Sequence, residues 1–261
     1  MERVSFGGCM SVAVNTIQFE KGDIIFETNA PATHIYVLEK GELGVKYGDN
    51  PLVEVGSIQE GESFGESALL IGGKRSATIS CETQVTIKSF DADQIKGMFK
   101  KWVDGKLMCQ CLLIEMINSN EMMRTRALSN DRETSRSPVL TDLVNNAVSS
   151  VATLAQTVRH PEELIDAWKG NSAFLVTGGH ALVRHGNDAI EIGSDTCLGA
   201  SQLVLGQDPS DSIAIDSISE PLAGWFIPIT DQYNKLIEHN KGLAAVARGI
   251  AHKTARSAVI S

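Results

Sequence analysis

The sequence predicts a mainly β protein built from two tandem β-rolls, with helices between and after them. Three observations support this fold class. Short apolar runs recur about every ten residues up to residue 90, separated by turn signals such as Gly41 and Gly48. The same rhythm returns over residues 173–230. Stretches in which apolar residues follow helical spacing lie between and behind the two β regions.

The first β region consists of runs that alternate apolar with polar residues, bounded by Gly, Asn or Pro. We expect strands near residues 12–19, 24–26, 34–38, 43–47, 53–55, 79 and 85–87. Short strands at this spacing are typical of a β-barrel or jelly roll. Helices are expected over residues 91–99, with Asp91 as the N-cap, and over residues 104–126.

A polar segment that starts at residue 129 indicates a linker. The next apolar residues step by four and three positions, which is heptad spacing: Leu140, Val144, Ala147, Val151, Leu154 and Val158. A helix with this stripe either pairs with its twin in a homodimer or lies on one of the domains. A further helix is expected to begin at Pro161 and to end before Gly170.

The composition argues against several function classes. A net charge of −9 does not suit a nucleic-acid-binding protein, because a phosphate backbone requires a basic surface. No run reaches the roughly 18 apolar residues that span a bilayer, and the first residues lack a secretion signal. The five cysteines are scattered and odd in number, which favours a reducing compartment. We therefore expect a cytoplasmic protein with no nucleic-acid or membrane partner.

The candidate binding site lies within residues 62–79. A glycine turn at Gly65 is followed by the acid Glu66, a short apolar helix and then Arg75. Such a helix start directs backbone N–H groups at one point, and a guanidinium suits a phosphate through two parallel hydrogen bonds. The carboxylate suits a ligand that also offers a hydroxyl, such as a ribose. The alternative is a helix capping box from Ser63 to Glu66, with a solvated loop arginine.

The string FGESALLIGGKRSAT resembles the phosphate-binding cassette of the cyclic-nucleotide-binding domain family, found in catabolite activator proteins and protein kinase A regulatory subunits. KGDIIF and IYVLEKGELGV resemble that family's opening strands, so the resemblance covers roughly residues 12–127. It implies an eight-stranded β-roll that binds cyclic AMP or cyclic GMP. Glu66 would bind the ribose 2′-hydroxyl and Arg75 the cyclic phosphate. The implied ligand-binding residues are Gly65, Glu66, Ser67, Arg75, Ser76 and Ala77.

Residues 173–215 repeat the pattern of the first β region, which indicates an internal duplication. The two charged groups of the cassette do not recur in this second copy. Ala200 stands at the position of Glu66, and Asp211 falls at that of Arg75. A carboxylate repels a phosphate, so we expect the second copy not to bind a cyclic nucleotide in the usual way.

Together these patterns predict a non-catalytic cyclic-nucleotide sensor. Cyclic AMP is favoured over cyclic GMP, because the small pair Ser76-Ala77 is common in cyclic-AMP relatives. The expected domains are 1–128 with the intact cassette, 129–170 as a helical linker and dimerisation helix, and 171–261 as the degenerate copy with a C-terminal helix.

The helices are expected to relay occupancy to the second domain, to a dimer partner or to an unidentified protein effector. Glu66 has no partner acid or base, so we expect no enzymatic activity and no catalytic cofactor or metal. The alternative is a ligand-independent scaffold that uses both β-rolls as architecture.

Overall fold

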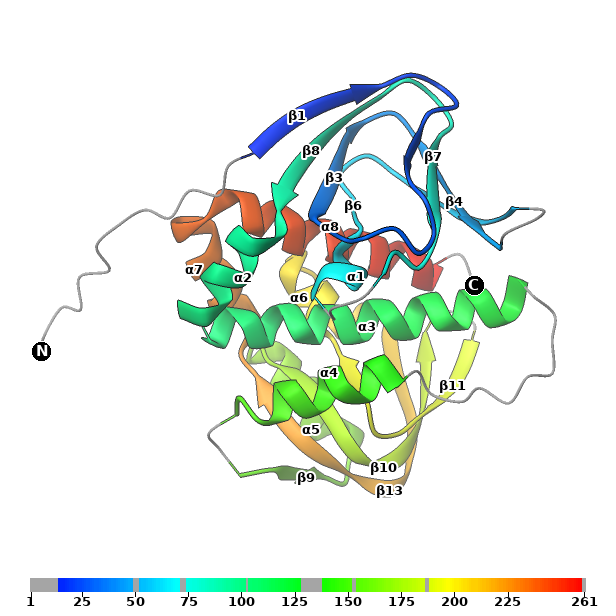
Figure 1. The fold of residues 1–261 in the computed structure, drawn as a ribbon. Coiled ribbons are helices and arrows are strands. Elements are labelled where there is room, and N and C mark those ends of the chain that lie inside the picture. Colours follow the sequence, from blue (N-terminus) through cyan, green and yellow to red (C-terminus); the bar gives the residue numbers. More distant parts are fainter. Residues whose placement is uncertain are drawn as a thin grey trace, which may run out of the picture.

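The computed structural model describes residues 14–48, 52–70, 74–101, 103–127, 138–151, 154–185 and 188–259. Two β layers lie on opposite sides of a layer of helices (Figure 1). The blue and cyan strands of the first half form the upper layer, and the yellow-green to orange strands of the second half form the lower one. The predicted fold class, mainly β with helices, is confirmed at this level.

The first β layer is a roll of eight described strands in two four-stranded antiparallel sheets. One sheet has the order β1-β8-β3-β6 and the other the order β2-β7-β4-β5. Their bounds are β1 Val14–Phe19, β2 Ile24–Phe26, β3 His34–Lys40, β4 Leu43–Tyr47, β5 Val53–Ile58, β6 Ser63–Phe64, β7 Thr78–Cys81 and β8 Val85–Asp91. Apolar side chains between the two sheets, such as Leu38, Ile58 and Ile87, form a core of their own.

The second β layer is a single five-stranded sheet in the described residues. Its order is β11-β10-β13-β9, and β12 pairs with β10. The bounds are β9 Gln156–Val158, β10 Ala173–His185, β11 Asp188–Ile192, β12 Thr196–Leu198 and β13 Ile213–Ile227. An eight-stranded roll was expected here. The sheet differs because β10 and β13 each continue through the position where the first roll divides its chain into two strands.

Most of the helices form the layer between the sheets, but the helix Pro161–Lys169 packs in a separate core with the second sheet. The bounds of the helices are α1 Glu66–Leu70, α2 Ala92–Lys101, α3 Val103–Ala127, α4 Pro138–Val148, α5 Pro161–Lys169, α6 Ala200–Val204, η1 Pro209–Asp211, α7 Ile229–His239 and α8 Lys241–Val259. One core cluster contains Ile35 of the first roll, Leu112 of α3, Leu175 of the second sheet and Val246 of α8. The two halves therefore share a core. No helix in the described part of the chain is long and apolar enough to cross a membrane.

Local sequence signals place several helix ends correctly. The carboxylate of Asp91 accepts hydrogen bonds from the backbone N–H groups of Asp93 and Gln94, as expected of an N-cap. Helix α5 begins at Pro161 and ends before Gly170. The tail forms two helices, α7 and α8, rather than the single tail helix that the sequence suggested.

The prediction of one helix through residues 140–158 is wrong. Helix α4 ends at Val148, and β9 follows as a strand paired with β13. The hydroxyls of Ser149 and Ser150 both donate to the carbonyl of Asn146, at 2.8 and 3.0 Å. Such side-chain bonds compete with the helical backbone pattern and end the helix.

The helical part of the heptad stripe is buried within the protein's own core. Its members Leu140, Val144 and Ala147 are buried, together with the neighbouring Leu143, in the core that α4 shares with α3. Leu154, beyond the end of the helix, is 90% exposed. This agrees with the interpretation of α4 as a helix that lies on a domain.

Candidate functional site

The predicted cassette begins where β6 turns into α1. Gly65 makes this turn with a φ of +77°, a conformation that side chains with a Cβ rarely adopt. A Cβ at Gly65 would also lie 2.4 Å from Nη1 of Arg75. Glu66 is the first residue of α1 and is 1% exposed. The fold thus brings the three predicted residues Gly65, Glu66 and Arg75 together.

Arg75 lies under the turn and is 3% exposed. Its Nη1 donates to the carbonyl of Gly65 at 2.7 Å, and its Nη2 donates to the carbonyl of His34 at 2.8 Å. Its guanidinium carbon lies 4.1 Å from the ring centroid of Phe26, which is a cation–π contact. Burial lowers the pKa of Arg75, and the charges of Tyr36 and Glu66 oppose that shift. The alternative of a solvated loop arginine is therefore wrong.

Two buried polar atoms of the cassette have no hydrogen-bond partner in the part of the chain that the structure describes. They are Oε2 of Glu66, an acceptor, and Nε of Arg75, a donor. The hydroxyl of Ser63 is also without a partner there, so it does not cap α1 in a capping box. An unpaired buried polar atom costs about 1–3 kcal/mol. The pair fits a ligand that offers a hydroxyl and an anionic oxygen.

The other predicted ligand residues lie around this pair. Ser67 is half-buried on α1. Ser76 is exposed, and Ala77 is half-buried directly before β7. Their part in binding stays a prediction.

The sequence did not single out a stack of three aromatic rings at the cassette, of which Phe26 and Tyr36 lie beside Arg75. The ring centroids of Phe26 and Tyr36 are 5.9 Å apart, and those of Tyr36 and Phe64 are 5.0 Å apart. Burial raises the pKa of Tyr36, and Arg75 opposes that shift. Phe26 and Tyr36 belong to strands that the sequence predicts, whereas Phe64 lies in β6, which was not among the predicted strands. Only the pairing of the strands stacks the three rings and brings Phe26 and Tyr36 to the guanidinium.

Helix α8, from the far end of the chain, also contacts the cassette. Nζ of Lys253 lies 3.4 Å from Oε1 of Glu66. Arg256 donates to both carboxylate oxygens of Glu62, at 2.6 and 2.9 Å, and to the carbonyl of Ser57 at 2.6 Å. Sequence reasoning alone missed these contacts of Lys253 and Arg256. Their spacing of three residues on one helix face is the signal that could have suggested a common partner.

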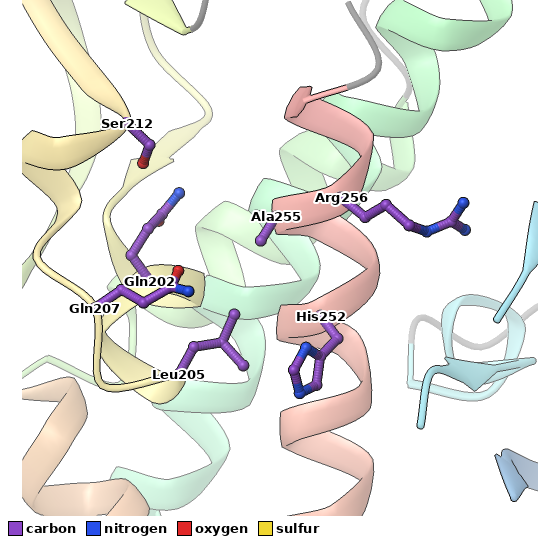
Figure 2. A pocket seen from close by; sticks show the side chains of 7 residues that line it. All are labelled: Gln202, Leu205, Gln207, Ser212, His252, Ala255 and Arg256. Atoms are coloured by element: carbon purple, nitrogen blue, oxygen red, sulfur yellow. The ribbon is translucent and has the colours of Figure 1, made fainter. Parts of the chain in front are cut away.

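The opposite side of α8 borders a cleft of about 340 Å³ against α6 and the loop after it. In Figure 2, Arg256 extends from α8 away from Gln202 and Ser212. Burial lowers the pKa of His252, which favours the neutral imidazole there. The residues lining the cleft are Gln202, Leu205, Gln207, Ser212, His252, Ala255 and Arg256.

The predicted second copy places its key residues differently. Asp211 is exposed on η1, and Ala200 is fully buried at the start of α6. The backbone N–H groups of Ala200 and Ser201 donate to the carboxylate of Glu115 on α3, at 2.7 and 2.8 Å. Burial raises the pKa of Glu115 to about 7, against the effect of these hydrogen bonds. A single acid inside the apolar stretch 111–117 was the sequence signal for this contact.

Comparison with known proteins shows what the first domain is similar to. Residues 16–101 match the family model described as "Cyclic nucleotide-binding domain". A cAMP-dependent protein kinase regulatory subunit of Neurospora crassa is 26% identical over 183 residues, which are 65% of this chain and 42% of the relative. Its counterpart from Emericella nidulans is 32% identical over 86 residues, 33% of this chain and 21% of the relative. The chain thus spans less than half the length of either relative.

Among solved structures, one described as "Sp-2Cl-cAMPS bound to PKAR CBD2" is 24% identical, with a TM-score of 0.30. It covers 34% of this chain and 62% of its own. The comparisons thus show that residues 16–101 match the cyclic nucleotide-binding domain model and that the chain is similar to part of the two regulatory subunits. The resemblance deduced from the cassette is confirmed to that extent. The matched range ends before the predicted second copy.

Proposed function

We propose that the chain is a non-catalytic sensor that binds a cyclic nucleotide in its first domain. The observation that supports this most is the buried pair Glu66 and Arg75, each with one polar atom that is unpaired among the described residues. In this assignment Oε2 of Glu66 accepts the ribose 2′-hydroxyl, and Arg75 holds the cyclic phosphate. The remaining ligand residues proposed are Gly65, Ser67, Ser76 and Ala77.

Cyclic AMP is the proposed ligand in preference to cyclic GMP. The basis is the small pair Ser76-Ala77 after the arginine. Ser76 is exposed, so its hydroxyl is free of the packing that holds Arg75. Calorimetric titration with both nucleotides measures this preference directly.

We also propose that residues 171–261 are a degenerate second copy of domain 1–128, with 129–170 between them. Glycines at aligned positions support the duplication. Gly41 and Gly179 have φ of +98° and +84°, and Gly65 and Gly199 have φ of +77° and +93°.

The helical layer is the proposed route of the signal. Helix α3 follows the first roll and carries Glu115, which binds the start of α6 in the second half. Helix α8 returns from the second half and contacts Glu66 and Glu62 beside the cassette. A ligand that binds one arrangement of these helices better than another shifts their equilibrium. The readout would be a second domain, a homodimer partner or an effector protein.

The direct test is titration calorimetry of the full chain with cyclic AMP and cyclic GMP. Arg75→Lys keeps a cation but loses the planar fork, and we expect its affinity to fall by roughly two orders of magnitude. Asp211→Asn is the matched control in the second copy, and we expect it to bind like the wild type. Circular dichroism confirms that each variant is folded. The absence of binding heat with either nucleotide at high micromolar concentration would contradict the sensor proposal.

The alternative is a ligand-independent scaffold, and one observation favours it. Both terminal nitrogens of Arg75 already donate to backbone carbonyls, those of Gly65 and His34, as a purely structural arginine would. In that case the folded wild type gives no heat with either nucleotide, and Arg75→Lys changes only its stability. Partner binding that is indifferent to added nucleotide would be the positive sign of the scaffold.

A further inference from the structure

The buried ion pair between Lys253 and Glu66 joins the C-terminal helix to the cassette of the first roll. The two residues are 187 positions apart in the chain. The side chain of Lys253 is 15% exposed and that of Glu66 is 1% exposed. An exposed pair of this kind would be worth little, but a buried carboxylate depends on its charged neighbours.

The position of Lys253 is fixed by the way α8 packs on the roll. A Cβ at Gly249 would lie 2.5 Å from the backbone nitrogen of Ser63, so the helix passes this strand in direct contact. About two turns further on, Arg256 donates to both oxygens of Glu62. Lys253 lies between these two contacts. Its ammonium is therefore held close to the cassette.

The ion pair gives the two oxygens of the Glu66 carboxylate different surroundings. Oε1 faces Lys253, while Oε2 is buried and unpaired among the described residues. A carboxylate fixed in this way presents one defined acceptor. We infer that Lys253 is a positioning residue of the cyclic-nucleotide site, which orients Glu66 so that Oε2 accepts the ribose 2′-hydroxyl. This inference rests on the proposed function, and it assigns part of the first domain's site to the second half of the chain.

The test is a double-mutant cycle between Lys253 and the 2′-hydroxyl of the ligand. Titration calorimetry on the full chain compares cyclic AMP with 2′-deoxy cyclic AMP for the wild type and for Lys253→Met. We expect Lys253→Met to lose roughly tenfold in affinity for cyclic AMP, the scale of one hydrogen bond to a charged group. For the deoxy ligand we expect a change of less than about twofold.

Two variants serve as controls. Lys253→Arg restores a cation, and we expect it to regain most of the affinity for cyclic AMP. Lys241→Met removes the same charge from the exposed start of the same helix, and we expect it to bind both ligands like the wild type.

Each other outcome overturns the inference in a recognisable way. Equal losses for the two ligands mean that Lys253 only holds the helix in place. A gain in cyclic AMP affinity in Lys253→Met means that the lysine competes with the ligand for Glu66. If the wild type binds cyclic AMP and 2′-deoxy cyclic AMP equally well, Glu66 makes no contact with the 2′-hydroxyl. A wild type that binds neither ligand overturns the proposed function and this inference with it.

Discussion

The contact between Arg256 and Glu62 is expected to be a principal anchor of α8 on the first roll. Glu62 is 2% exposed, and the Arg256 side chain is 31% exposed. Breaking a fully buried pair costs about 3–5 kcal/mol, because a charge is left without its partner. Arg256 is partly solvated and Glu62 keeps one bond from the backbone of Gln59, so we expect about 2–3 kcal/mol for Arg256→Met.

The measurement is a double-mutant cycle by urea unfolding, followed by tryptophan fluorescence and circular dichroism. Arg256→Met alone leaves the Glu62 carboxylate charged and unpaired, and adding Glu62→Gln removes that charge. We therefore expect the double variant to lose about 1–2 kcal/mol less unfolding free energy than the two single variants added together. The exposed pair Lys169 and Asp166, with side chains 63% and 76% exposed, is the matched control, and its coupling should stay below about 0.5 kcal/mol. A coupling equally small for Arg256 and Glu62 would refute the anchoring role of α8.

Further predictions concern packing and pH. Gly249→Ala should lower the free energy of unfolding by about 1–3 kcal/mol, since its methyl group meets the backbone of Ser63. Gly97→Ala, with open space around the new methyl, should instead raise it by up to about 1 kcal/mol, and urea unfolding that ranks the two alike contradicts the close helix contact. Burial raises the pKa of Glu115 from 4.5 to about 7, so between these pH values the folded chain binds this proton more tightly than the unfolded chain. Its contribution to stability therefore falls as pH rises through that window, by on the order of 3 kcal/mol. Glu115→Gln should lack this fall in urea titrations from pH 4 to 8, and a variant that keeps the wild-type slope would assign the effect to another group.

Much of the first domain could be predicted from the sequence, because its signals are local. Alternation of apolar and polar residues marks the strands, and glycine or proline marks their ends. The spacing of Gly65, Glu66 and Arg75 was enough to indicate the cassette, since a turn, a helix start and a returning arginine lie within eleven residues. The roles of these residues toward a ligand remain proposals.

The helix expected through residue 158 shows where local patterns were misleading. The heptad stripe continued past residue 148, but Ser149 and Ser150 bond back to Asn146, and β9 finds a partner in β13. Pairing between distant strands overrode the helical spacing, since a strand is stabilised by its neighbour in the sheet and not by its own sequence alone.

The sequence by itself determined the first roll, the cassette and the loss of its two charged residues from the predicted second copy. Only the tertiary structure placed Lys253 on Glu66, Arg256 on Glu62 and Glu115 on the start of α6. These contacts join residues 187, 194 and 85 positions apart. A lone lysine, arginine or glutamate carries no local sign of such a partner, because burial and packing of whole helices bring the charges together.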